Sequence, residues 1–239
     1  MRRFYAPPES SGESGITLDV DETRHLRDVL RLKVGDGVSV FDGTGREFRC
    51  SIREITKRAS TLEQLEEITP ASPESPLAIT VAATVLNGDK YDLIIQKAVE
   101  LGVAVLIPLI TVRCDVRIKD AAKRLQRWRR IALEATKQCG RAKLMQISEP
   151  TTFMDLITTE IAPDVVMFSE RDGSRFKSLV LGTDLTVMYG PKGGWDDSEL
   201  EAARSRGVKI ITLGGRILRA ETAAIAITAI LQYQFGDMS

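Results

Sequence analysis

The sequence predicts an α/β protein in two parts, a small β-barrel followed by a larger domain built on an open parallel sheet. Three observations support this prediction. Near the C-terminus a short apolar run, a glycine-rich loop, a helix, a second apolar run and a second glycine-rich loop follow one another. The apolar runs of this half do not alternate with polar residues, which is typical of parallel strands covered on both faces. A proline-rich stretch at residues 69–76 separates the two halves.

Residues 1–68 consist of short alternating runs interrupted by glycine, the pattern of a small β-domain. A hairpin is expected from residues 38–41 and 47–55, which are joined by the turn-forming sequence Asp-Gly-Thr-Gly. Residues 61–67 predict a further strand, and residues 23–32 predict a helix or helical turn.

Three prolines lie within residues 69–76, and proline continues neither a helix nor a central strand. This stretch therefore predicts a stiff linker between domains at residues 1–68 and 77–239. Beyond it, the spacing of apolar residues predicts alternating strands and helices. Strands are expected at residues 77–86, 104–110 and 165–168, helices between Asp89 and Gly102 and at residues 120–140, and a weak helical or loop segment at residues 176–181.

The organising feature of the C-terminal half is a pair of glycine-rich loops. Residues 185–189 and 209–213 predict short buried strands, and each run stops at glycine. Between them Asp196 and Glu199 have the spacing of a capping box, so a helix is expected at residues 197–206. Open α/β sheets bind ligands outside the carboxyl ends of their strands. We therefore expect the two strands to be neighbours and both loops to face one crevice.

The first loop, Gly190-Pro191-Lys192-Gly193-Gly194, has two interpretations. Taken alone, the pattern is equally typical of a simple turn. The second glycine-rich loop and the apolar helix after it favour a ligand site, because glycine lets backbone groups approach a ligand without an intervening Cβ. The nucleotide P-loop is excluded, since no Gly-Lys-Ser/Thr follows, and the G-x-G-x-x-G pattern of dinucleotide sites is absent.

Charge is unevenly distributed, although the formal net charge is zero. Residues 113–143 contain eleven Lys or Arg against three acids, a local excess of eight, whereas residues 63–74 contain four acids and no base. Apolar residues in this basic segment follow helical spacing, so we expect Trp128 to lie in the core and not to stack on a base. A charged run is often only a solvated face. The scarcity of acids nearby favours a surface that binds RNA phosphates.

Cysteine usage and hydropathy point to a cytoplasmic protein without a metal site. Cys50, Cys114 and Cys139 are widely spaced, odd in number and without a C-x-x-C pair, which supports neither a disulfide framework nor zinc. No signal-peptide pattern is present, and no apolar stretch approaches the roughly 18 residues that a membrane span needs.

Two features concern partners. The helix expected at residues 222–231 is apolar nearly all round, which predicts burial on every side, and a homodimer interface would supply the missing cover. His25 is the only histidine. A lone histidine is more often structural than catalytic, and among functional roles its basic neighbours favour contact with RNA.

Two motifs enclose the predicted crevice, Gly190-Pro191-Lys192-Gly193-Gly194 and Leu213-Gly214-x-Arg216-Ile217-Leu218-Arg219-x-Glu221-Thr222-Ala223. Further matching segments are Arg2-Arg3-Phe4, His25-Leu26 with residues 29–36, residues 96–102 and residues 127–135. Together they resemble the RsmE family of small-subunit ribosomal RNA methyltransferases, which belong to the SPOUT superfamily. The resemblance spans nearly the whole chain and is therefore specific.

The resemblance implies a PUA-like RNA-binding β-barrel at residues 1–68. At residues 77–239 it implies a SPOUT-type open parallel sheet with a C-terminal trefoil knot. The implied activity transfers a methyl group from S-adenosylmethionine to N3 of a uridine in small-subunit (16S) ribosomal RNA. The implied cofactor-binding residues are Gly190, Pro191, Gly193, Gly194, Leu213, Gly214, Ile217 and Leu218.

Catalysis by this route needs stabilisation of a uracil anion. Uracil N3 is a poor nucleophile until its proton leaves, and an arginine that donates to O2 or O4 stabilises the resulting charge. Arg219 and Arg141 are the arginines that the motifs place near the crevice. Glu221 is a candidate base, although a cap or an ion-pair partner at the start of the last helix is an equally good interpretation. Contacts with RNA are expected from Arg2, Arg3, His25, Arg27, Arg31, Arg124, Arg127, Arg130, Lys137 and Arg141.

Three residues depart from the usual family pattern. Lys192 replaces a glutamate, Gly215 stands where proline is common, and Ala220 where threonine is common. Backbone-mediated cofactor binding would survive these changes, whereas Lys192 would weaken or invert any contact that the usual glutamate makes with the cofactor or with an arginine. Two alternatives remain, a non-catalytic RNA-binding or ribosome-assembly factor of the same fold, and a SPOUT methyltransferase that acts on transfer RNA.

Overall fold

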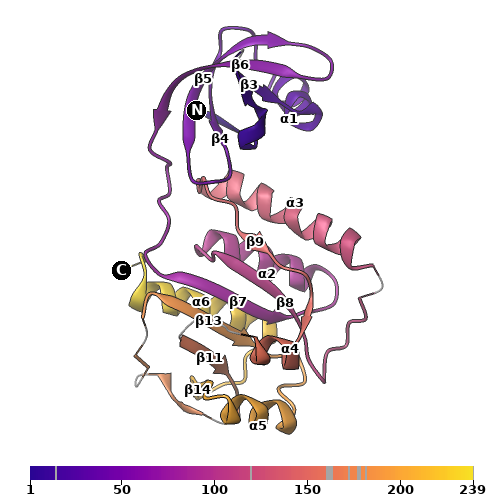
Figure 1. Cartoon of the computed structure of the whole chain (residues 1–239), viewed down its shortest axis with the longest axis vertical. Coiled ribbons are helices and arrows are strands. Elements are labelled where there is room, and N and C mark those ends of the chain that lie inside the picture. Colours follow the sequence, from indigo (N-terminus) through magenta and orange to yellow (C-terminus); the bar gives the residue numbers. More distant parts are fainter. Residues whose placement is uncertain are drawn as a thin grey trace. The chain divides into compact units, whose positions relative to one another are not determined.

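The computed structural model describes residues 1–13, 15–118, 120–159, 164–171, 173–176, 179–180 and 182–238. The chain divides into two compact units (Figure 1). Unit 1 comprises Met1–Glu74 and Thr136–Leu144, and unit 2 comprises Ser75–Ala135 and Met145–Ser239. The weak segment predicted at residues 176–181 lies partly outside the described residues. No helix within the described ranges is long and apolar enough to cross a membrane.

Unit 1 is built on a six-stranded sheet with the strand order β1-β4-β5-β6-β3-β2. β1 pairs with β4 in parallel, and the remaining pairs are antiparallel. The predicted hairpin is confirmed by β4 and β5, and the predicted strand after it by β6. The strand bounds are β1 Arg2–Tyr5, β2 Ser11–Gly12, β3 Gly15–Leu18, β4 Gly37–Phe41, β5 Glu47–Ile55 and β6 Ser60–Ile68.

The helical segment of unit 1 begins and ends earlier than the predicted residues 23–32. It consists of α1 Val20–Arg24 followed by a π-helical turn, His25–Val29. Asp19 explains the early start, because its carboxylate accepts the backbone N–H of Glu22 at 2.8 Å and so caps the helix. The early end is followed by Arg31, whose positive φ of 55° is incompatible with a continuing right-handed helix.

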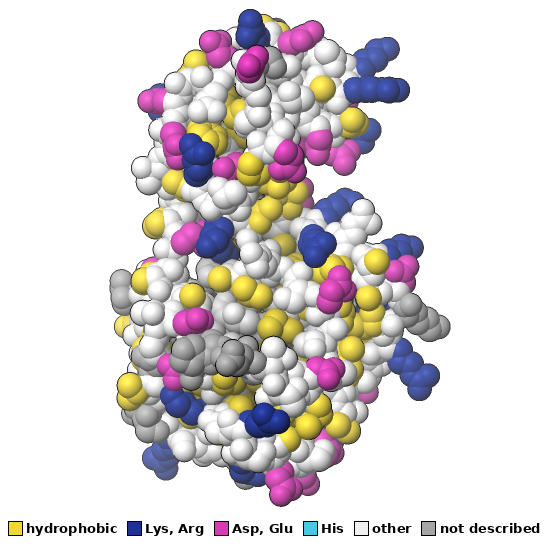
Figure 2. Space-filling view, viewed as in Figure 1, with side chains coloured by type: hydrophobic (Ala, Val, Ile, Leu, Met, Phe, Trp, Pro, Cys, Tyr) yellow, Lys and Arg dark blue, Asp and Glu magenta, His cyan; other side chains and the backbone are white. Residues whose placement is uncertain are grey.

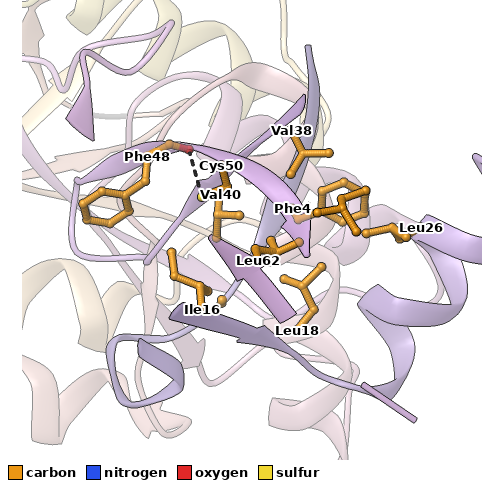
Figure 3. Packing of buried hydrophobic residues seen from close by; sticks show 11 residues of the cluster. Phe4, Ile16, Leu18, Leu26, Val38, Val40, Phe48, Cys50 and Leu62 are labelled. Atoms are coloured by element: carbon orange, nitrogen blue, oxygen red, sulfur yellow. Dashed lines mark hydrogen bonds between the residues drawn. The ribbon is translucent and has the colours of Figure 1, made fainter. Parts of the chain in front are cut away.

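The core of unit 1 is formed by side chains that point inward from alternate positions of its strands (Figure 3). Phe48 and Cys50 on β5 are buried, whereas Arg49 between them is exposed, as the two-residue period of a strand requires. Leu26 of the π-helical turn packs against the same cluster. Full burial of each large apolar side chain contributes roughly 1.5–3 kcal/mol.

Residues 136–144, which sequence analysis placed in the C-terminal domain, are packed with unit 1. The guanidinium of Arg3 explains this grouping. It pairs with Glu47 at 3.0 Å and donates to the backbone oxygens of Thr136 at 3.0 Å and Arg141 at 2.5 Å. Arg3 thereby satisfies carbonyl groups that the end of a helix leaves without partners.

Unit 2 contains an eight-stranded parallel sheet with the order β10-β8-β7-β13-β11-β14-β12, in which β9 also pairs with β8. The parallel sheet predicted from the apolar runs is therefore confirmed. Its strands are β7 Ala78–Thr84, β8 Val105–Ile110, β9 Gln146–Ile147, β10 Thr151–Thr152, β11 Asp164–Phe168, β12 Ser174–Arg175, β13 Asp184–Tyr189 and β14 Lys209–Thr212.

Helices cover both faces of this sheet. Ala82 of β7 belongs to an apolar cluster with residues of α4 Phe153–Thr158 and α5 Asp197–Ser205. Its neighbour Val81 points the other way and lies beside residues of α2 Asp89–Glu100 and α6 Ala220–Phe235. The absence of alternation in these strands thus has the predicted cause, burial on both faces.

The prediction that the two strands ending in glycine loops are neighbours in the sheet is wrong. β11 lies between β13 and β14 and pairs with both. Periodicity identifies each strand but carries no information on which strands pair. The crevice is therefore built from three strand ends, including one that the glycine pattern did not mark.

The predicted basic helix is α3 Ala121–Cys139, and its predicted apolar stripe is confirmed. Leu125, Trp128, Ala132 and Ala135 are buried, and Cys139 is half-buried. The Trp128 ring packs against Tyr91 of α2 with a centroid separation of 5.0 Å. Trp128 is therefore a core residue, as expected.

Helix α6 is covered by its own chain on one side only. Ile227 is 3% exposed and belongs to the buried side, together with Thr228 and Leu231. Tyr233 is 65% exposed and Ile230 is 36% exposed. The helix is thus not buried all round by unit 2, and its exposed apolar side is the part that a partner would have to cover.

Candidate functional site

The carboxyl ends of β13, β11 and β14 surround a crevice of about 350 Å³. This is the edge where open parallel sheets bind ligands, and the volume falls within the roughly 300–1,000 Å³ of small-molecule pockets. The start of α6 closes one side. The crevice is lined by Phe168, Ser169, Glu170, Tyr189, Gly190, Pro191, Lys192, Gly193, Gly194, Trp195, Thr212, Leu213, Gly214, Gly215, Arg216, Ile217, Leu218, Ala220, Ala223 and Ile227.

The first glycine loop is packed too tightly for side chains at two positions. A Cβ added to Gly190 would lie 3.0 Å from the Trp195 indole. Gly194 has a φ of +70°, and a Cβ there would lie 2.3 Å from Oε1 of Glu170. Close packing thus favours glycine at 190, and the positive φ favours it at 194, quite apart from any ligand.

Trp195 and Arg171 tie the first loop to the end of β11. The buried indole N–H of Trp195 donates to the backbone oxygen of Phe168 at 2.7 Å. In return Arg171 donates to the backbone oxygen of Trp195 and pairs with Asp197 at 3.3 Å. These reciprocal contacts fix the first glycine loop relative to the end of β11.

Arg113, in the loop after β8, supports the same glycine loop from another side. Its guanidinium donates to the backbone oxygen of Gly193 and to Oδ2 of Asp196, both at 3.1 Å. Asp196 and Glu199 form the predicted capping box, which confirms that prediction for α5. Glu199 also accepts the backbone N–H of Val112 at 2.9 Å, so the loop after β8 contacts the start of α5 through both Val112 and Arg113.

The ionisation of Asp196 follows from these contacts. Hydrogen bonds from the hydroxyl and the backbone N–H of Ser198, and then the nearby Arg113, lower the pKa of Asp196 below its ordinary value. The carboxylate is therefore charged at neutral pH, which favours both its cap and its ion pair.

The second glycine loop is open where the first is tight. Gly214 and Gly215 have φ values of +72° and +77°, and a Cβ on either would meet no atom of the described residues within 4 Å beyond its chain neighbours. Ile217 is 82% exposed, and Leu213 and Leu218 are also exposed. Such apolar side chains at the rim of a polar loop are typical of a surface that a ligand or partner covers.

The eight residues predicted to bind a cofactor all line the crevice. They come from both glycine loops and from the segment that leads into α6. The sequence thus correctly predicted that these distant segments line one crevice. The eight are Gly190, Pro191, Gly193, Gly194, Leu213, Gly214, Ile217 and Leu218. Their role in binding stays a prediction.

The three residues predicted to be catalytic lie in different settings. Arg219 is exposed and immediately precedes α6, next to the crevice residues Leu218 and Ala220. Glu221 pairs with Lys90 of α2 at 3.4 Å. Arg141 belongs to unit 1, is 3% exposed, and holds Glu74 through hydrogen bonds of 3.0 and 2.6 Å.

Glu221 is better suited to an ion pair than to proton abstraction. Burial alone would raise its pKa. Hydrogen bonds from its own backbone N–H and from Lys90, with the charges of Lys90 and Arg219, outweigh burial and lower the pKa below its ordinary value. A carboxylate with a lowered pKa is a weak base at neutral pH.

In unit 1, several of the side chains predicted to contact RNA have partners within the protein. Arg3 pairs with Glu47, Arg27 with Asp28 at 2.7 Å, and Lys137 with the buried Glu22 at 2.6 Å. His25 is half-buried and its ring packs edge-on against Phe4, as a structural histidine would. The exposed members of the set are Arg2 and Arg31.

The expectation that the basic segment lacks counter-charges is wrong for part of it. Arg113 pairs with Asp196, Arg127 with Asp92, Lys137 with Glu22, and Arg141 with Glu74. These acids are far away in the sequence, which is why a local count misses them. On the face drawn in Figure 2, basic and acidic side chains are likewise interspersed. Within the described part of the chain, no ion pair involves Arg124 or Arg130.

Sequence reasoning missed the wall that β11 contributes. Ser169, Glu170 and Arg171 follow directly after Phe168, the last residue of β11. Polar residues immediately after a buried strand were the available signal, since the carboxyl ends of parallel strands meet at one edge.

Comparison with known proteins identifies the family. A family model described as an RNA methyltransferase domain matches residues 73–232, and one described as an RNA methyltransferase PUA domain matches residues 18–65. The ribosomal RNA small subunit methyltransferase E of Rickettsia conorii is 34% identical over 238 residues, which cover 96% of this chain and 93% of that protein. The chain belongs to the ribosomal RNA small subunit methyltransferase E (RsmE) family.

Other RsmE proteins match at full length. The RsmE of Aquifex aeolicus is 30% identical and covers 97% of this chain and 99% of its own. Among solved structures, RsmE from Neisseria gonorrhoeae bound to S-adenosyl methionine is 34% identical, with a TM-score of 0.90 and complete coverage of both chains. The predicted family, the PUA-like domain and the open α/β sheet are confirmed, while the trefoil knot stays a prediction.

Proposed function

We propose that this RsmE-family chain is an S-adenosylmethionine-dependent methyltransferase that acts on small-subunit ribosomal RNA, with N3 of a uridine as the methylated atom. The observation that carries the proposal is the crevice of about 350 Å³ at three strand ends, lined by both glycine loops. A relative with this fold over its full length is bound to S-adenosyl methionine. A ribosomal RNA substrate in turn favours the cytoplasm as the place of action.

The residues of the crevice fit this cofactor. Backbone groups at Gly214 and Gly215 are accessible, because no described residue apart from their chain neighbours lies within 4 Å of where their Cβ atoms would be. Ile217 and Leu218 add exposed apolar surface suited to the flat adenine ring. Apolar walls with a few precisely placed polar groups are the usual composition of such a pocket.

In the proposed reaction the cofactor supplies a methyl group on a positively charged sulfonium, which is already activated. The protein therefore has to bind, align and stabilise developing charge. Arg113, Arg171 and Trp195 hold the first glycine loop and the end of β11 in a fixed arrangement. We assign to these three the alignment of the crevice walls.

Arg219 is proposed to stabilise the uracil anion. Its side chain is exposed at the start of α6, beside the crevice. Donation to O2 or O4 would hold the charge that forms when N3 loses its proton. Glu221, whose pKa is lowered, is assigned to fixing this helix start through Lys90 and not to removing the proton. Arg141 is not assigned this role, because its guanidinium is buried and engaged by Glu74.

RNA binding is proposed to use the PUA-like unit and two arginines of α3, the half-buried Arg124 and the exposed Arg130. Arg124 and Arg130 are the strongest candidates on α3, because no ion pair among the described residues neutralises them. Arg2 and Arg31 are the exposed candidates in unit 1. Phosphate contacts of this kind provide affinity and leave sequence choice to other groups.

A homodimer through α6 is proposed from its uncovered apolar side. Ile230 and Tyr233 are exposed on the helix that also lines the crevice with Ala223 and Ile227. Covering this side removes apolar surface from water, which favours association. The arrangement would place the interface next to the proposed cofactor site.

The proposal is tested by mass spectrometry of nucleosides from RNA of cells with and without the protein. We expect 3-methyluridine in small-subunit ribosomal RNA to disappear when the protein is absent and to return when it is restored. Appearance of the same change in transfer RNA instead would assign a different substrate. Unchanged RNA of both kinds would contradict the proposed activity.

A further inference from the structure

One charged group in the crevice differs in sign from its neighbours. Among the described residues that line it, Glu170 is the one acid, beside the two bases Lys192 and Arg216. It lies at the end of β11, the strand between the two that carry glycine loops. A carboxylate at this central position faces any ligand that spans both loops.

The backbone on both sides of Glu170 is fixed. Before it, Phe168 accepts the Trp195 indole N–H at 2.7 Å and the Ser169 N–H donates to the Ile211 oxygen at 3.0 Å. After it, Arg171 donates to the Trp195 oxygen and pairs with Asp197. Glu170 is therefore presented by a rigid segment and not by a free loop.

The carboxylate lies directly on the first glycine loop. Its Oε1 would be 2.3 Å from a Cβ on Gly194, so glycine at that position leaves room for it. Among the described residues its one ion-pair neighbour is Arg171 at 3.6 Å, and that guanidinium is shared with the Trp195 oxygen and Asp197. The Glu170 side chain remains about one-third exposed, at 34%, and accessible from the crevice.

We propose that Glu170 is a cofactor-binding residue that pairs with the positively charged end of S-adenosylmethionine, its sulfonium or its ammonium group. The inference rests on the proposed function, because it takes this cofactor as the ligand. The cofactor carries both positive groups at its methionine end, and a carboxylate held in a partly desolvated crevice attracts them more strongly than one in water. The two bases in the lining cannot do this.

Calorimetric titration of Glu170→Gln tests the assignment with three ligands. S-adenosylmethionine has both positive groups, S-adenosylhomocysteine keeps only the ammonium, and 5′-methylthioadenosine has neither. We expect S-adenosylmethionine to bind roughly 10- to 100-fold more weakly, the scale of losing one hydrogen bond to a charged group, and 5′-methylthioadenosine to bind unchanged. Loss of S-adenosylhomocysteine affinity as well would assign the ammonium, and its retention would assign the sulfonium.

Two further variants separate charge from structure. Glu201→Gln removes an exposed acid of α5 that does not line the crevice and should bind all three ligands like the unmodified protein. Glu170→Asp keeps the charge and should keep the preference for S-adenosylmethionine over 5′-methylthioadenosine. Thermal unfolding confirms that each variant is folded.

The inference is overturned if Glu170→Gln binds S-adenosylmethionine as tightly as the unmodified protein. It is also overturned if all three ligands weaken equally, since the residue would then act on local structure alone. Failure of the unmodified protein to bind any of the three would contradict the proposed function itself, which is a distinct outcome.

Discussion

At the residue scale, the glycines around the crevice are required for two different reasons. Gly190 and Gly194 are confined by Trp195 and Glu170, so a side chain there would displace the wall. Gly214 and Gly215 face open space but have positive φ values. An L-residue in that conformation costs roughly 1–2 kcal/mol. Packing against Trp195 thus favours glycine at 190, whereas a positive φ favours glycine at 194, 214 and 215.

Arg219→Ala should separate catalysis from cofactor binding. If Arg219 stabilises the charge on uracil, its loss should lower methyl transfer by roughly 10²-fold, the scale of removing one preorganised donor. Cofactor affinity should stay within a few-fold, because the side chain is exposed beside the crevice. Single-turnover assays and calorimetry measure the two quantities, with Arg206→Ala, at the exposed arginine that follows α5, as a control. Equal loss of binding and transfer would make Arg219 a binding residue.

The lowered pKa of Asp196 predicts a dependence of stability on acid. A carboxylate with a folded-state pKa below its unfolded value stabilises the fold above the unfolded pKa of about 3.9, and this contribution is lost as pH falls through the lower, folded pKa. Asn at this position still caps a helix but carries no charge. We expect the melting temperature of Asp196→Asn to fall less steeply than that of the unmodified protein below about pH 5. Parallel curves would show that the charge contributes nothing.

At the element scale, the two sides of α6 should respond differently to a charge. Ile230→Asp places a carboxylate on the exposed side and should leave the protomer folded while weakening the proposed dimer. Ile227→Asp is unsuitable for this test, because Ile227 is buried in its own chain and an unpaired charge there costs several kcal/mol of protomer stability. Sedimentation velocity of both variants measures the difference. A monomeric unmodified protein at micromolar concentration would contradict the interface.

Helix α3 offers a second test at this scale. Replacing Arg124 and Arg130 by Ala should weaken RNA binding and reduce the magnitude of the slope of log K against log salt by about one to two. Binding releases counterions at each phosphate that a base neutralises, so fewer are released when these two contacts are lost. Arg127 is left in place because it pairs with Asp92 of α2 and its loss would also disturb that contact. Fluorescence titrations over a range of salt concentrations supply the slope. An unchanged slope would exclude this side of α3 from the RNA contact.

At the scale of the whole molecule, local patterns predicted elements but not their arrangement. The β4–β5 hairpin, the capping box of α5 and the parallel strands follow from spacing over a few residues. The insertion of β11 between β13 and β14 depends on connections between distant segments, which no local period records. The packing of residues 136–144 with unit 1 depends in the same way on Arg3, which is far away in the sequence.

The position of the crevice was predictable from the glycine loops at strand ends. The charged groups that line and support it were not. All eight residues expected to bind the cofactor line it. The roles of Glu170, Arg113 and Arg171 depend on contacts across the fold, so the residues gave no local signal of their partners. For the same reason, acids from other elements neutralise several bases that look unpaired in the sequence.

S-adenosylmethionine is proposed to bind in the crevice that both glycine loops line. Gly214 and Gly207 form a matched pair for testing this. Their φ values are +72° and +74°, and beyond the chain neighbours neither has an atom of the described part of the chain within 4 Å of an added Cβ. Gly214 lines the crevice, and Gly207 does not. Valine at either position should therefore cause similar backbone strain.

Calorimetric titration of S-adenosylmethionine into the unmodified protein and into both valine variants is the most direct measurement. We predict binding by the unmodified protein and by Gly207→Val, and loss of binding by Gly214→Val through side-chain atoms that occupy the crevice. Normal binding and turnover by Gly214→Val would place the cofactor elsewhere and contradict its binding in this crevice.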